Sequence, residues 1–385
     1  MKKKDILLRC LRVFTLLFAV AVSTLALQWL LKNYAKTNFG RVNGFYLEKK
    51  DTIDVVFIGA SEVYCDFAPG YAYEKYGFTS YPFVTQGSTV KNFTTAVKEA
   101  VRTQHPKLIV IEINGALYDE PHYSKEAYTR YFIDNIPLNE NKIEFIRDHV
   151  SENRLEYYLP IIKYHSSWKS LPKGIIWNAS VIADDCRGYN LLKGIRTKAS
   201  VHPMDRTMLL NLRPDAGQER APLLEDAEKQ LIRLLEYCKE EDLNLLFVRF
   251  PHAVLDKERN RFGRAATAGD IIRSYGFPYV SFDFLFDEIG LDPEKDFYNP
   301  EHLNIFGQEK FTEFFSEYLM KNCGITVSDL DPKTKAEWDK CAAYYEQYAE
   351  LNRILLDRRI GVFLGDDIVS YSAVKNLKKY RHYLD

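Results

Sequence analysis

An uncharged run near the N-terminus is the feature that most constrains this chain. It extends from Val13 to Leu31, and the next charged residue is Lys32. As a helix at 1.5 Å per residue, the run is about 28 Å long, close to the hydrocarbon thickness of a bilayer. The run therefore predicts one transmembrane helix over residues 13–31, followed by a large body.

The charges around this run predict its orientation. Residues 1–12 hold five basic residues and one acidic residue, a side-chain charge of +4, and fewer basic residues follow the run. Because positive flanks stay in the cytoplasm, we expect residues 1–12 inside and the body outside the membrane. A cleaved signal peptide fits less well, since the run exceeds the usual apolar length and no A-x-A site precedes Lys32. A buried core helix is the third alternative.

The overall charge and the cysteines exclude several classes of protein. The 385 residues carry a formal net charge of -1, which argues against nucleic-acid binding. None of the six cysteines has C-x-x-C spacing, so we expect neither a metal site nor a disulfide framework. A glycine-rich phosphate loop is also missing, and the sequence predicts no cofactor.

The remaining sequence alternates between apolar β-rich runs and helical patterns. Several of the runs are continuously apolar, as in strands that are buried on both faces of a parallel sheet. The five runs are residues 54–58, 81–85, 108–113, 243–250 and 277–282. Helical patterns lie at residues 90–102, 223–241, 257–275 and 305–320. This alternation predicts an α/β fold with a five-stranded, doubly wound parallel sheet.

Two segments lie outside this alternation. Residues 115–222 are too long for one crossover, and we interpret them as a helical insertion after the third strand, with helices near 141–150 and 154–163. The insertion is either a wall of a substrate groove or a subdomain packed on the core. Residues 323–385 form a C-terminal extension, with a helix at 333–358, a possible strand at 360–367 and a basic tail.

Ser61 and His302 are the candidate catalytic residues. Ser61 directly follows the first predicted strand, where backbone N–H groups can stabilise an oxyanion, although serine at a helix start is often only a cap. His302 follows the last strand in a polar turn, and His252 after the fourth strand is the second choice. Ser61 near the start of the domain and His302 near its end are thus both expected at the same edge of the sheet. A nucleophile and its base must be neighbours in this way.

These residues resemble the SGNH (GDSL-type) hydrolase superfamily. The match consists of GASEV around Ser61, TQGST around Gly87, IEINGAL around Asn114 and NPEHLNIFG around His302, in the family's order. The resemblance covers about residues 50–322 without the insertion, and implies a three-layer α/β/α, flavodoxin-like catalytic domain. It also implies a nucleophilic Ser61, a basic His302, and an oxyanion hole that includes Gly87 and Asn114.

The sequence also departs from the family pattern. Asn299 stands where the family has the aspartate of D-x-x-H, so the acid that orients His302 remains open. Asp296 is our candidate, Asp283 is another, and a Ser-His dyad without an acid is the third. Glu62 replaces the usual small residue beside the nucleophile, and Asn114 lacks the usual G-x-N-D setting.

With the N-terminal anchor, the chain resembles membrane-anchored DltD-like and AlgJ-like proteins. That resemblance implies an extracytoplasmic serine acyltransferase or esterase that acts on acyl groups of a cell-surface polysaccharide or teichoic-type polymer. It also implies a multi-spanning partner of the MBOAT acyltransferase type. A glycan deacetylase and a catalytically inactive scaffold, which binds polysaccharide or that partner, are the alternatives.

Overall fold

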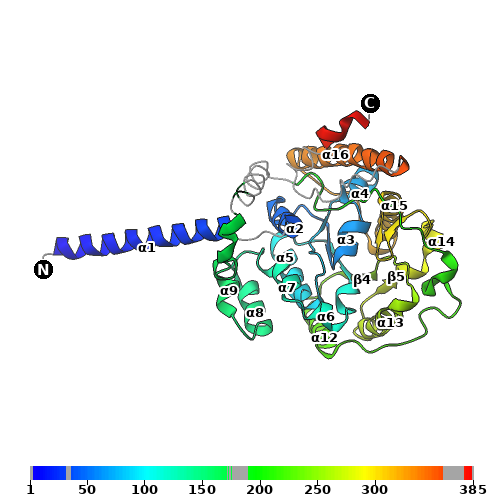
Figure 1. Cartoon of the computed structure of the whole chain (residues 1–385), viewed down its shortest axis with the longest axis horizontal. Helices are drawn as coiled ribbons and strands as arrows, with labels where there is room; N and C mark the ends of the chain where they lie inside the picture. The colour runs from blue at the N-terminus through cyan, green and yellow to red at the C-terminus, as the bar shows by residue number, and fades with distance from the viewer. Residues whose placement is uncertain are drawn as a thin grey trace.

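The computed structural model describes residues 3–31, 36–170, 172, 175, 190–358 and 377–383. Its first helix, α1 (Lys3–Leu31), extends away from the rest of the chain (Figure 1). Residues Lys4–Gln28 of α1 are long and apolar enough to cross a membrane, and none of that window is buried against the body. The predicted N-terminal helix is therefore present, with the dimensions of a membrane span.

A five-stranded parallel sheet forms the centre of the body. The strands lie in the order β2-β1-β3-β4-β5, and every neighbouring pair is parallel. Their bounds are β1 Val55–Ile58, β2 Ser80–Pro82, β3 Leu108–Glu112, β4 Leu245–Arg249 and β5 Tyr279–Ser281. The α/β class and the five parallel strands predicted from the sequence are confirmed.

The central strands β1, β3 and β4 are apolar along most of their length because the sheet is buried there on both faces. In β1, Val56 and Ile58 pack with α5 (Phe93–Gln104) and α12 (Glu225–Glu240), while Val55 and Phe57 pack in a second core with α3 (Ser61–Asp66) and α15 (Ile305–Cys323). The strands β3 and β4 alternate between the same two cores. Successive residues of a strand point to opposite faces, so a strand with two buried faces needs an apolar residue at every position.

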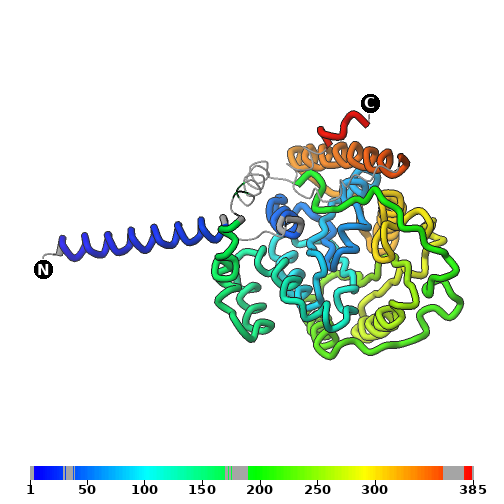
Figure 2. The backbone as a smooth tube through the Cα atoms, in the orientation of Figure 1, coloured from blue at the N-terminus to red at the C-terminus, as the bar shows by residue number. Residues whose placement is uncertain are grey.

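The insertion is helical at its start and extended at its end. Its helices are α6 Glu120–Tyr123, α7 Glu126–Ile133, α8 Glu140–His149, α9 Arg154–Tyr158 and α10 Ile161–Tyr164. The later part runs along the outside of the body, as the green tube in Figure 2 shows. Its backbone bonds to distant loops, for example from Arg196 N to Tyr64 O (2.8 Å) and from His202 N to Phe297 O (2.8 Å).

Further helices lie before, between and after the strands. They are α2 Lys36–Leu47, α4 Pro69–Tyr76, α13 Arg259–Ser274, α14 Phe286–Ile289 and α16 Pro332–Asp357. An antiparallel hairpin of β6 (Phe297–Asn299) and β7 (His302–Leu303) precedes α15, and the sequence patterns did not predict it.

The predicted strand at 360–367 and Cys186 lie outside the described residues.

The C-terminal extension packs on the rest of the body through α16. Trp338 of α16 is buried against Tyr73 of α4, with ring centroids 5.1 Å apart, and Lys193 Nζ lies 4.2 Å above the Trp338 ring. Lys193 also forms a buried ion pair with Glu48, at 2.7 Å. The insertion, the segment after α2 and the extension therefore meet in one buried cluster.

Removing one member of this buried ion pair leaves the other charge buried without its partner. We expect Lys193→Met to lower the free energy of unfolding by about 3–5 kcal/mol, and the double change Lys193→Met with Glu48→Met to recover most of that loss. Urea unfolding of the full chain in detergent measures both. The exposed Lys49–Asp331 pair is the matched control, since Lys49→Met there should have a much smaller effect. Equal losses at the two sites contradict this prediction.

Candidate active site

The candidate residues gather at one edge of the sheet because all five strands are parallel. Ser61, Gly87 and Asn114 follow β1, β2 and β3, while His252 and Asp283 follow β4 and β5. The strand order places β1 between β2 and β3, so the Ser61 loop is flanked by the Gly87 and Asn114 loops. Crevices at the carboxyl ends of such strands, where the strand order reverses, are the common ligand sites of this architecture.

Ser61 begins the helix α3 and is partly exposed. The next five residues of α3 are all buried, so Ser61 is where this helix reaches the surface. Ala60 occupies the N-cap position, with no capping bond from a side chain. The alternative that Ser61 is the N-cap of the helix is therefore wrong, and another role for its hydroxyl remains open.

Two glycines let the neighbouring loops approach closely. Gly87 has a left-handed backbone (φ 62°), and a Cβ atom there would lie 2.7 Å from the ring of Tyr128. A Cβ atom on Gly115 would lie 2.6 Å from the carbonyl oxygen of Ser88. The loop after β2 and the loop after β3 are thus in contact, next to Ser61.

His302 lies on β7, which packs directly against α3. Its ring is 7% exposed and stacks on Tyr298, with ring centroids 5.3 Å apart. Nδ1 of His302 lies 2.9 Å from Oδ1 of Asn299. An amide oxygen only accepts, so Nδ1 carries the proton and Nε2 is the basic nitrogen. Nε2 is buried and has no hydrogen-bond partner among the described residues.

The carboxylates predicted as possible partners of His302 are bonded elsewhere. Asp296 accepts from the backbone N–H of Asp292 (2.7 Å) and from Lys310 (2.6 Å). Asp283 accepts from His252, both from its backbone N–H (2.8 Å) and at Nδ1 (3.2 Å), and from Arg249. The structure does not bring Asp296 or Asp283 to His302, and Asn299 takes that position.

His252, and not His302, is thus the histidine with an aspartate partner. Burial and Arg249 lower the pKa of His252, but two carboxylates outweigh them and raise it to about 10. Asp283 is hydrogen-bonded to Nδ1, and Glu62 lies 3.8 Å from Nε2. Burial lowers the pKa of His302 below its usual value, although Glu62 and Glu301 oppose this. At neutral pH, His252 is a cation and His302 is neutral, so of these two histidines only His302 has a ring nitrogen that can accept a proton.

Glu62 connects these groups and was not predicted to do so. Burial raises the pKa of Glu62, but the adjacent, positively charged His252 outweighs burial and lowers it to about 2. Its Oε1 lies 3.8 Å from His252 Nε2 and accepts from Asn114 Nδ2 at 2.5 Å. One N–H of the Asn114 amide is thus held by Glu62, and Asn114 itself is fully buried.

Glu112 at the end of β3 supports the same asparagine. Its Oε1 accepts from the backbone N–H of Asn114 at 3.0 Å. Burial and the nearby charge of Glu62 raise the pKa of Glu112 to about 8, so it is largely protonated at neutral pH. The signal for both groups was present in the sequence, since Glu112 ends an otherwise apolar strand and Glu62 directly follows Ser61 in the loop-to-helix segment after another.

The insertion adds an aromatic wall beside Gly87. The ring of His122 lies between Tyr118 and Tyr128, at centroid distances of 3.7 Å and 4.3 Å. Tyr128 is the residue that contacts Gly87, and Arg261 lies 5.6 Å above Tyr118. The start of the insertion therefore forms part of the surroundings of the candidate site.

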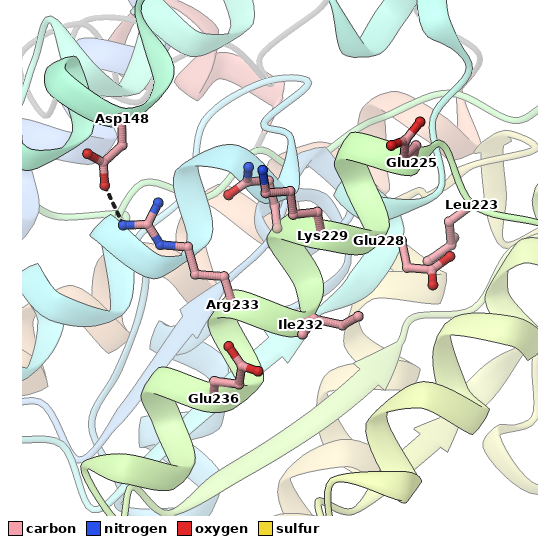
Figure 3. Close-up of a pocket in the computed structure, with 9 residues that line it drawn as sticks. Asp148, Leu223, Glu225, Glu228, Lys229, Ile232, Arg233 and Glu236 are labelled. Carbon is pink, nitrogen blue, oxygen red and sulfur yellow. Dashed lines mark hydrogen bonds and ion pairs between the residues drawn. The ribbon is translucent and has the colours of Figure 1, made fainter.

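An open groove elsewhere on the body is separate from this site. It has a volume of about 680 Å³ and follows α12, as Figure 3 shows. Glu225, Lys229 and Arg233 line it, and Arg233 reaches across to Asp148 of α8 (2.5 Å). None of the residues at the carboxyl edge of the sheet lines this groove.

Comparison with known proteins gives no assignment. No protein-family model matches the chain, and no curated protein matches it significantly. Within the described ranges, no group of three histidine, cysteine or acidic residues is arranged to hold a metal ion. The argument for function therefore rests on the residues of the site.

The opposite charge states of the two histidines can be measured directly. We expect His302 to titrate below pH 6.5 and His252 near pH 10, by NMR of ring-labelled histidine in the full chain. Because the charge of Glu62 raises both values, Glu62→Gln should lower both, so each histidine loses its proton at lower pH. Glu294→Gln, at an exposed position, is the control. Two histidines that titrate together near pH 6.5 contradict the assignment.

Proposed function

We propose that this protein is a membrane-anchored serine acyltransferase or esterase of the SGNH type. The observation that carries the proposal is the pairing of α3 with β7, which places a neutral, Asn299-bonded His302 against the helix that begins at Ser61. The strand order and the two cores on either side of the sheet support a three-layer, flavodoxin-like arrangement for this catalytic domain.

The proposed reaction passes through an acyl-serine. Ser61 Oγ attacks the carbonyl carbon of an ester, while Nε2 of His302 takes the hydroxyl proton. The oxyanion accepts hydrogen bonds from the backbone N–H groups of Ser61 and Gly87 and from the second N–H of the Asn114 amide. His302 then returns the proton to the leaving alcohol. A sugar hydroxyl or water attacks the acyl-serine in the second half, with His302 again as base.

Glu62 has a defined role in this mechanism. It holds the Asn114 amide in place, and its charge raises the pKa of His302. A raised pKa means a stabilised imidazolium, which forms during the proton transfer. Asn299 orients the ring but carries no charge, so Glu62 supplies part of the electrostatic support that an aspartate gives in a triad.

The membrane-length helix α1 favours a substrate that is located at the cell surface. We propose that α1 crosses the membrane once, with residues 1–12 in the cytoplasm and the catalytic body outside. A surface polysaccharide or teichoic-type polymer then supplies or accepts the acyl group, beside a multi-spanning acyltransferase of the MBOAT type. Asn299 in place of the aspartate favours one alternative, an inactive scaffold that binds the same polymer or partner.

A serine-directed probe separates the enzyme from the scaffold. We expect a fluorophosphonate to label the full chain and Ser61→Ala to abolish labelling, because the probe reacts only with an activated hydroxyl. His302→Gln should slow labelling by at least about a hundredfold, through loss of the base. Ser274→Ala, on the exposed end of α13, is the control. Unlabelled wild type, or equal labelling of Ser61→Ala, overturns the proposal.

Asn299→Asp tests the unusual partner of His302. Aspartate can accept the same bonds from His302 Nδ1 and from the backbone N–H of Glu301 (2.9 Å), and it adds a negative charge. We expect hydrolysis of a nitrophenyl ester to rise by about tenfold or more, with its acid limb shifted to higher pH. Asn322→Asp, at an exposed position, should change neither. A folded Asn299→Asp variant with unchanged rate and pH profile contradicts this role.

A further inference from the structure

A short part of the insertion packs against the membrane helix. The helix α10 and the following 3₁₀ turn η3 (His165–Ser170) both contact α1. Figure 1 shows the C-terminal end of α1 meeting the body at this green segment, with the rest of α1 projecting away. The insertion therefore lies where the proposed membrane span ends.

The segment from α9 to η3 exposes a group of large apolar side chains among its polar ones. They are Leu155 (60% exposed), Leu159 (38%), Ile162 (38%) and Trp168 (63%), and we call them the juxtamembrane face. Outside α1, they are four of the eleven large hydrophobic side chains that are exposed in the described part of the chain. Scattered exposed apolar residues are normal, but a cluster within fourteen positions is not.

The inner side of the same segment is firmly attached to the body. Tyr157 is buried and packs under Arg130 of α7, with the guanidinium 3.8 Å from the ring centre. Arg130 also binds Glu156 at 3.1 Å, and the Tyr164 hydroxyl donates to Asp134 at 2.7 Å. The juxtamembrane face is thus presented by a packed support.

The composition of this face matches the interface of a bilayer. Tryptophan is enriched at the level of the lipid headgroups, where its ring is buried and its N–H remains hydrated. The exposed Lys169 directly follows Trp168 and can interact with lipid phosphates, whereas Lys163 is paired with Glu126 at 3.1 Å.

We propose that the juxtamembrane face lies in the headgroup region of the leaflet from which α1 emerges at its C-terminal end. This inference rests on the proposed membrane assignment of α1 and is independent of the chemistry at Ser61. A single helix leaves the body free to tilt and rotate, whereas two contacts hold it in one orientation. The catalytic edge then stays at a constant height above the lipid surface.

Quenching by brominated lipids tests the contact. The full chain is reconstituted into phosphatidylcholine–phosphatidylglycerol vesicles with or without bromine near the headgroup end of the acyl chains. The difference between wild type and Trp168→Phe isolates the fluorescence of Trp168, and we expect bromine to reduce it at least twofold. The difference between wild type and Trp338→Phe isolates the fluorescence of a core tryptophan, and bromine should not reduce it.

Two matched variants and one independent measurement separate the outcomes. Leu159→Glu with Ile162→Glu should abolish the quenching of Trp168. Met208→Glu should not, because Met208 is also exposed (60%) but lies on a turn that is attached to α14 by the Arg206–Asp287 pair.

Resistance to alkaline carbonate reports whether α1 is inserted. Insertion without quenching of Trp168 overturns the juxtamembrane contact, and loss of insertion overturns the membrane assignment itself. Concentration-dependent burial of Trp168 in lipid-free micelles, together with dimers in sedimentation, assigns the face to a second copy and overturns the lipid contact.

Discussion

The contact between α3 and the β6–β7 hairpin is the interaction on which the candidate site depends. It joins residues that are more than two hundred positions apart, and its centre is the hydrogen bond from Leu303 N to Asp66 Oδ1 (2.9 Å). Gln308 adds a second link, since its side chain donates to the Cys65 carbonyl at 2.6 Å. Because Ser61 begins α3 and His302 lies on β7, any loss of this contact separates the proposed nucleophile from its base.

Buried charge determines which histidine can act. His252 has the carboxylate partner, and for that reason it is held as a cation at neutral pH. His302 has only an amide partner, and burial keeps it neutral with Nε2 available. Glu62 lies between the two, so the same carboxylate pairs with the charged histidine, raises the pKa of the neutral one and orients Asn114.

The other parts of the chain are arranged around this centre. The insertion gives an aromatic wall to the site at its start, contacts α1 through α10, and binds α16 through Lys193. The C-terminal extension is therefore packed into the same body, although the sequence alone left it as a separate segment. One inserted segment thus contacts the candidate site, the N-terminal helix and the C-terminal extension.

The sequence by itself determined the class of the sheet, the membrane-length helix, and the placement of Ser61, Gly87 and Asn114. Those features follow from local patterns, since a strand buried on both faces is apolar at every position and parallel strands end at one edge. Only the tertiary structure decided that Asn299, and not Asp296 or Asp283, contacts His302, and that Glu62 binds Asn114. Hydrogen-bond partners and charge states depend on how distant loops pack and exclude water, and short sequence patterns contain no information about that packing.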